Sequence, residues 1–256
     1  MGKNKLRKFA EMENLPLVFQ YPYRTLQAGG FPLRGRWSEF FGNANPITVE
    51  LGCGKGEYTV GLARRFPERN FIGIDIKGAR MYSGASAATA EGLKNVAFVR
   101  TSIELLEAFF APGEVAELWI TFPDPQMKKV NKRLTGTRFI EMYRRVLAPG
   151  ALVHLKTDSP FLYDYTLMMA RHNGLAIADA NADIDASGAR AADPVLAIYT
   201  HYERQWLDRG LTIRHLAFDP AGPAPLAEPP EADELAHDTY RSYSRGYIQM
   251  PDLMKE

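Results

Sequence analysis

The chain has 256 residues, of which 46% are hydrophobic, and it carries a formal net charge of +1 and a single cysteine. This length allows one large core with extensions, and one cysteine excludes an internal disulfide framework and is consistent with a reducing cytoplasm. Because the sequence has no long apolar run, no signal-peptide core and no cysteine–histidine cluster, we expect a cytoplasmic protein without a membrane span or a metal site.

Strand-like and helix-like segments alternate from residue 46 to residue 218. We expect strands at 46–51, 71–75, 96–99, 115–121, 151–156, 175–184 and 211–218, and helices at 55–66, 77–92, 104–110, 137–148, 160–172 and 195–209. Repeated strand–helix units predict an α/β fold with a doubly wound, mostly parallel sheet of seven strands and helices on both faces. Ligands of such sheets bind at the carboxyl ends of the strands.

Two further regions flank this domain of residues 46–218. Residues 1–45 are expected to form a separate arm that is basic at first and then aromatic and glycine-rich. Residues 219–256 are expected to form a proline-rich linker, extended and mobile, and a C-terminal tail. For the tyrosines and arginines at 240–245, contact with RNA and docking on the domain both remain open.

A glycine loop follows the first strand, with Glu50 two residues before Gly52 and then Gly54. Glycines let backbone N–H groups approach a ligand at a helix N-terminus. A dinucleotide loop would carry a glycine where Glu57 stands, and Glu50 would repel a pyrophosphate. Glu50 instead suits a cation, such as the ammonium and sulfonium groups of S-adenosylmethionine. Asp75, at the end of the second strand, lies where an acid binds ribose hydroxyls, so this cofactor is favoured over NAD. A purely structural turn is the alternative.

Residues 121–134 place one carboxylate, Asp124, between two prolines at the end of an apolar run. The prolines restrict the backbone, so the carboxylate should have a fixed direction. Four cations follow it: Lys128, Lys129, Lys132 and Arg133. They supply the charges that a phosphate backbone requires, although a solvated basic loop is the alternative. An oriented acid beside such cations predicts chemistry on a polyanion.

These motifs together resemble those of the tRNA (guanine-N7-)-methyltransferases. The resemblance covers about residues 46–205 and rests on the glycine loop, the strand 71–75, the Pro-Asp-Pro segment around Asp124, Leu155-Lys-Thr-Asp158 and Thr200-His-Tyr-Glu203. It implies a class I, Rossmann-like methyltransferase fold, S-adenosylmethionine as cofactor, tRNA as partner and methylation of a variable-loop guanosine. It also implies that Asp158, Thr200 and Glu203 contact the guanosine or the methionine part of the cofactor.

The chain departs from the family pattern at three places. Gln126-Met127 stand where Trp-Pro commonly follows Pro-Asp-Pro, and the histidine- and arginine-rich run that usually comes next is thinner here. Thr101-Ser102-Ile103-Glu104 stand where many members carry an aspartate. The resemblance therefore implies adenine contacts by Ser102 and Ile103 in place of that aspartate.

Guanine N7 carries an in-plane lone pair and needs no deprotonation, so catalysis depends on alignment more than on a strong base. Methyl transfer moves positive charge from sulfur to the purine, and a fixed carboxylate then attracts the ring more strongly. We predict that Asp124 acts in this way, binds the N1–H and N2–H₂ donors of guanine, or both. Lys128 is the predicted substrate contact beside it, with Lys129, Lys132 and Arg133 as possible phosphate contacts.

Several alternatives remain open at this point. A tRNA-binding module without catalysis, an NAD-dependent oxidoreductase and a small-molecule methyltransferase are the competing functions. Asp158 could instead cap the following helix, and Glu203 could instead face solvent. Lys156 could bind a carboxylate rather than RNA. Monomer and homodimer are both compatible with the sequence.

Overall fold

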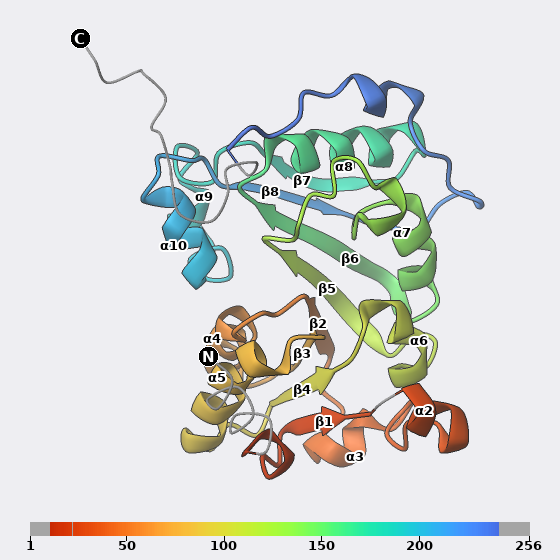
Figure 1. The fold of residues 1–256 in the computed structure, drawn as a ribbon, viewed down its shortest axis with the longest axis vertical. Coiled ribbons are helices and arrows are strands. Elements are labelled where there is room, and N and C mark those ends of the chain that lie inside the picture. The colour runs from red at the N-terminus through yellow and green to blue at the C-terminus, as the bar shows by residue number, and fades with distance from the viewer. Residues whose placement is uncertain (1–10, 22, 241–256) are drawn as a thin grey trace.

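The computed structural model describes residues 11–21 and 23–240. Its strands are β1 (Val18–Gln20), β2 (Ile47–Leu51), β3 (Asn70–Asp75), β4 (Val96–Arg100), β5 (Val115–Thr121), β6 (Leu147–Thr157), β7 (Ile177–Asn181) and β8 (Arg214–Phe218). They form one sheet in the order β1-β4-β3-β2-β5-β6-β8-β7, with helices on both faces (Figure 1). The pairs from β1 to β6 are parallel, and β8 runs antiparallel to β6 and β7. The predicted doubly wound α/β fold is confirmed.

Both faces of the sheet are buried, because successive side chains of each strand point to opposite sides and both sides carry helices. In β3, Ile72 and Ile74 belong to one core cluster, and Phe71 belongs to a second cluster together with Trp119 of β5. The strands therefore read as continuous apolar runs in the sequence.

Helices divide between these two clusters. The first cluster takes in residues of α2 (Tyr23–Gly29), α3 (Trp37–Phe41), α6 (Leu106–Phe109), α7 (Thr137–Arg144) and α8 (Pro160–His172). The second takes in residues of α4 (Glu57–Arg65), α5 (Gly78–Ala90), α9 (Ala189–Ala192) and α10 (His201–Leu207). The expected helix at 195–209 starts only at His201, because Thr200 and Glu203 form a capping box there. Short 3₁₀ turns are η1 (Ile103–Leu105), η2 (Val130–Lys132) and η3 (Pro230–Glu234).

The sheet has eight strands where we expected seven. The additional strand, β1, comes from the region predicted as a separate arm, and it pairs with β4 through Val18 and Phe98. In the same region Trp37 is fully buried and donates from Nε1 to the Phe109 carbonyl at 3.0 Å. Without β1, the backbone groups of β4 would form an open sheet edge, and covering such an edge prevents unwanted pairing.

Hydrogen bonds hold the segment that the sequence predicts as a mobile linker. Glu228 accepts from the hydroxyls of Tyr165 and Thr137, each at 2.6 Å. Asp238 accepts from Ser159 and from the Phe161 N–H, in the first turn of α8. Both carboxylates thus lie at helix N-termini, where negative charge is stabilised. Residues 241–245 of the tail lie outside the part of the chain that the structure describes. Within the described residues, no helix is long and apolar enough to cross a membrane.

Candidate active site

A cavity of about 540 Å³ opens at the carboxyl ends of β2, β3 and β5. Its volume falls in the range of small-molecule sites, and its position is the edge at which α/β sheets bind ligands. We call it the main cleft. Eight of the predicted site residues line it: Glu50, Gly52, Gly54, Asp75, Ile103, Asp124, Lys132 and Thr200.

The glycine loop and Asp75 are joined by hydrogen bonds. Gly52 and Gly54 adopt φ values of 75° and 56°, a region that favours glycine. The Gly54 N–H donates to Oδ2 of Asp75 at 2.9 Å, and the Lys77 N–H donates to Oδ1 at 2.7 Å. Because each carboxylate oxygen has two lone pairs, Asp75 can still accept hydrogen bonds from a ligand.

Two further glycines bring α4 and α5 together beneath this loop. A Cβ on Gly84 would lie 2.6 Å from the Lys55 carbonyl oxygen, and one on Gly56 would lie 2.7 Å from the Phe98 ring. No real side chain tolerates such contacts, so both positions require glycine. The close approach explains why glycines continue beyond the two that we predicted to contact the cofactor.

Glu50 lines the main cleft but is almost fully buried, with only 2% of the residue exposed. Its side chain is buried, and its oxygens accept from Thr121 Oγ1 at 2.6 Å and from the N–H and hydroxyl of Thr59. Burial raises the pKa of Glu50, and the hydrogen bonds from Thr121 and Thr59 lower it in part. Both oxygens of Glu50 thus accept hydrogen bonds from the protein, which fixes the carboxyl group next to the glycine loop.

The Asp124 loop has an unusual backbone. Phe122 and Gln126 have φ values of 48° and 49°, which non-glycine residues adopt only at a cost of about 1–3 kcal/mol each. Asp124 is exposed between them, and its Oδ1 accepts from the Gln126 N–H at 3.1 Å. Such strain persists only where the surroundings hold the chain, and it concentrates at functional sites.

Arg133 is the residue that holds this loop. Its Nε and Nη2 donate to the carbonyls of Gln126 and Met127 at 3.2 and 2.7 Å. Its guanidinium lies 4.4 Å from the ring centre of Tyr165 and 4.8 Å from that of Phe161. Only 3% of Arg133 is exposed, so the prediction that it contacts a tRNA phosphate is wrong for this conformation. Packing against α8 therefore buries one of the four cations that follow Asp124 in the sequence.

The three lysines that follow Asp124 differ in their surroundings. Lys128 and Lys129 are exposed and form no ion pair within the described part of the chain. Lys132 lies 3.8 Å from Glu104, which is also 3.5 Å from Arg138. Because exposed pairs of this kind contribute little, a phosphate can compete for Lys132.

Glu203 is fully buried rather than exposed to solvent. It accepts from Lys156 Nζ at 3.0 Å and from Arg190 Nη1 at 2.6 Å, and it closes the capping box with Thr200. The interpretation that Lys156 holds a carboxylate is therefore confirmed. Burial lowers the pKa of Lys156 to about 8, although Glu203 raises it in part. Substrate contact by Glu203 would require breaking this network, whereas Thr200 does line the main cleft.

Asp158 is also covered. It is 1% exposed, and its Oδ2 accepts from the Tyr240 hydroxyl at 2.7 Å. The helix cap that we considered for it belongs to Ser159, which accepts from the Leu162 N–H at 3.0 Å. In this structure Asp158 contacts the C-terminal segment, and the Tyr240 contact favours docking for the start of the tail.

Ser102 and Ile103 lie in two neighbouring cavities. Ile103 lines the main cleft, and Ser102 lines an adjoining cavity of about 310 Å³. Ile76, which we did not predict, lines both and is 62% exposed. Its signal in the sequence is its place directly after Asp75 at a strand end. Ile76 and Ile103 supply the apolar surface that a flat aromatic ring requires.

Two aromatic residues of α10 also line the main cleft without having been predicted. They are Tyr202 and Trp206, four residues apart and thus on one helix face. The Arg80 guanidinium lies over the Tyr202 ring at 5.7 Å. Their spacing was visible in the sequence, but only the position of α10 beside the glycine loop gives it meaning. Within the described residues, no group of three or more histidine, cysteine or acidic side chains has the arrangement of a metal site.

Comparison with known proteins agrees with this geometry. A family model described as a putative methyltransferase matches residues 44–216. A tRNA (guanine-N(7)-)-methyltransferase of Porphyromonas gingivalis is 58% identical over 237 residues, which cover 91% of this chain and 96% of that protein. One of Bacteroides fragilis is 53% identical over 246 residues, covering 96% of each. A solved structure, the 16S rRNA methyltransferase KamB, matches with a TM-score of 0.56 and 18% identity over 74% of this chain and 94% of that chain, which shows the fold alone. The chain therefore belongs to the tRNA (guanine-N(7)-)-methyltransferase family.

Proposed function

We propose that this protein transfers a methyl group from S-adenosylmethionine to N7 of a variable-loop guanosine in tRNA. The observation that carries the proposal is that one cleft joins the glycine loop and Asp75 to the strained loop around Asp124. A relative named tRNA (guanine-N(7)-)-methyltransferase is 58% identical to this chain over 237 residues, and this similarity supports the same substrate.

The main cleft fits S-adenosylmethionine residue by residue. Asp75 is fixed at the strand end and has lone pairs left for ribose hydroxyls. Ile76 and Ile103 supply apolar contacts for adenine. Gly52 leaves room at the loop for the methionine part, and the field of buried Glu50 favours a positive group there.

When bound, this cofactor supplies an electrophilic methyl group on a positively charged sulfur. Asp124 accepts hydrogen bonds from N1–H and N2–H₂ of guanine and so orients N7. No proton has to leave the base. As positive charge develops on the purine, its attraction to the Asp124 carboxylate grows, and this differential interaction lowers the barrier.

The exposed cations beside Asp124 bind the RNA backbone in this proposal. Lys128, Lys129 and Lys132 supply point charges for phosphates, and Thr200, which lines the main cleft, contacts the bound guanosine or the methionine part. Asp158 and Glu203 maintain the surrounding structure from buried positions. A cytoplasmic setting, where tRNA is available, completes the proposal.

The test is a methyl-transfer reaction followed by nucleoside mass spectrometry. Undermethylated tRNA is incubated with the protein and methyl-labelled S-adenosylmethionine, and labelled 7-methylguanosine is the expected product. The Asp124→Ala variant serves as the matched control, because it should bind the cofactor without producing the nucleoside. If the unaltered protein binds cofactor and tRNA but forms no 7-methylguanosine, the chain is a non-catalytic binding module instead. A calorimetric titration with S-adenosylmethionine shows whether the protein binds the cofactor in that case.

A further inference from the structure

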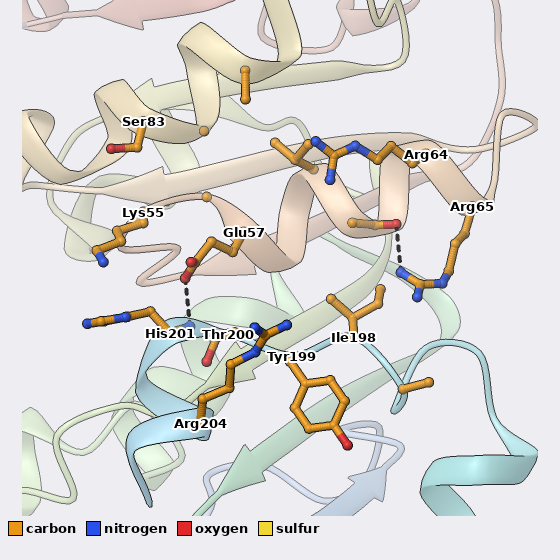
Figure 2. Close-up of a pocket in the computed structure, with 16 residues that line it drawn as sticks. Lys55, Glu57, Arg64, Arg65, Ser83, Ile198, Tyr199, Thr200, His201 and Arg204 are labelled. Carbon is orange, nitrogen blue, oxygen red and sulfur yellow. Dashed lines mark hydrogen bonds between the residues drawn. The ribbon is translucent and has the colours of Figure 1, made fainter. Parts of the chain in front are cut away.

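A second cavity of about 480 Å³ lies beside the main cleft, between α4, α5 and residues 197–204 (Figure 2). We call it the α4–α10 groove. Lys55, Glu57 and Thr200 line both spaces, so the groove and the main cleft adjoin each other. Five ionisable basic side chains line the groove: Lys55, Arg64, Arg65, His201 and Arg204.

The positive charge of the groove is only partly neutralised. Its one acid, Glu57, accepts from the backbone N–H of His201 at 2.8 Å, as the dashed line in Figure 2 shows. Arg64 forms a two-bonded ion pair with Glu91 outside the groove. Lys55, Arg65 and Arg204 have no carboxylate partner within the described residues. These three cations are available to an anion.

An exposed aromatic ring lies next to one of these cations, Arg204. Tyr199 is 39% exposed, although most large apolar side chains of the protein are buried. The guanidinium of Arg190 lies 4.5 Å from its ring centre and that of Arg204 lies 5.5 Å away. These guanidiniums hold the ring and cover part of it, so the exposed part of the ring is the surface on which an unpaired base can stack.

The floor of the groove is rigid, because the backbone of α4 packs directly on residues 197–199. A Cβ on Gly61 would lie 2.7 Å from Cγ2 of Ile198, so there is no space for a side chain between the two segments. The Arg65 Nη1 donates to the Gly61 carbonyl at 3.4 Å, which orients the guanidinium along the helix (Figure 2). The basic and aromatic groups therefore project from a fixed surface.

We propose that the α4–α10 groove binds an unpaired nucleotide of the substrate tRNA next to the guanosine in the main cleft. Its phosphates contact Arg65, Arg204 and Lys55, and its base stacks on Tyr199. The inference rests on the proposed function and extends it to the recognition of RNA. The groove also supplies cations for phosphate binding in place of Arg133, which is buried. Since Lys55, Glu57 and Thr200 line both spaces, the groove is adjacent to the main cleft, as two neighbouring nucleotides of one strand require.

The test measures tRNA binding as a function of salt with the double variant Arg65→Gln/Arg204→Gln. Lys55 stays unchanged, because it also lines the main cleft. Removal of two phosphate contacts should flatten the log–log salt slope by about 1.5 units and raise the KM for tRNA roughly tenfold. The Kd for S-adenosylmethionine and the kcat at saturating tRNA should remain within about twofold of the unaltered values.

Tyr199→Leu tests the stacking separately. It should weaken tRNA binding about 5- to 150-fold, as loss of one base–aromatic contact does, with the salt slope unchanged. Arg24→Gln/Arg171→Gln is the matched control, since it removes the same charge from exposed positions on α2 and α8. This control should keep the salt slope of the unaltered protein.

The inference is overturned if Arg65→Gln/Arg204→Gln keeps both the salt slope and the KM while its melting temperature is normal. A cofactor Kd that rises in this variant, with tRNA binding unchanged, would show that the groove holds an anionic part of the cofactor instead. The binding measurement does not depend on turnover. Absence of 7-methylguanosine with the unaltered protein would therefore refute the proposed function, whereas the binding data would still decide whether the groove binds tRNA.

Discussion

Replacement of Arg133 by methionine tests how the loop around Asp124 is held in place. The substitution keeps a long apolar stem and removes the guanidinium, so the carbonyls of Gln126 and Met127 lose their charged donor. The loop would then retain its strained backbone without the group that holds it.

The size of the effect follows from the hydrogen bonds that the substitution removes. Hydrogen bonds from charged groups contribute about 1.5–3 kcal/mol each, and two of them start at Arg133. Release from the desolvation of the buried guanidinium offsets part of this sum, which leaves about 2–3 kcal/mol. At about 2–4 °C per kcal/mol for a protein of this size, the Tm should fall by about 4–12 °C. A misplacement of Asp124 by about 1 Å should lower kcat on the order of 100-fold.

The assays are thermal unfolding, methyl-transfer kinetics at a temperature well below either Tm, and the salt dependence of tRNA binding. Arg138→Met is the matched control, because Arg138 is an exposed arginine nearby in the chain, at the start of α7, and its loss should change Tm by no more than about 2 °C. If Arg133→Met keeps its Tm and kcat but flattens the salt slope by about one unit, Arg133 binds a phosphate and the assignment as a loop-holding residue is refuted.

Three further predictions concern single carboxylates. Asp124→Ala should lower kcat 100-fold or more with cofactor affinity within about twofold, and near-normal turnover would exclude the proposed role. Asp75→Ala should raise the Kd for S-adenosylmethionine by roughly 10- to 150-fold, the equivalent of about 1.5–3 kcal/mol, and an unchanged Kd in calorimetry would exclude the ribose contact. Burial alone raises the pKa of Glu117, but His154 and Arg69 lower it to about 2, so its stabilising effect is complete above pH 4.5 and is lost as the pH falls towards 2. Urea unfolding should therefore show a loss of about 2 kcal/mol between pH 6 and pH 3 that is absent in Glu117→Gln; equal pH dependence in both proteins would contradict this.

Local sequence determined the elements and the positions of the acids along them. The strands follow from apolar runs bounded by glycine and proline, and the boundaries of β3 and β5 agree with the structure within one residue. Parallel strands bring their carboxyl ends to one edge, so the sequence predicts that Glu50, Asp75, Asp124 and Asp158 face one cleft there. The structure confirms this for Glu50, Asp75 and Asp124, which line the main cleft, but not for Asp158, which is buried against Tyr240.

The burial of charged groups was decided by packing between segments far apart in the chain. Nothing near Arg133 in the sequence indicates that α8 would supply two aromatic rings for its guanidinium. Likewise, Glu203 becomes a buried partner of Lys156 only because α10 packs over the end of β6. A charge pattern does not distinguish an exposed cation from a buried one, because burial depends on the partners that the fold provides.

The sequence by itself therefore determined the fold class and the acids of the main cleft, both of which follow from periodicity and strand order. Only the tertiary structure separated the available cations from the buried and paired ones, and only it placed Arg65, from α4, in the lining of one cavity with Tyr199 and Arg204. The physical reason is that secondary structure follows from neighbouring residues, whereas desolvation and ion pairing depend on contacts between segments that are distant in the chain, such as that between Lys156 and Glu203.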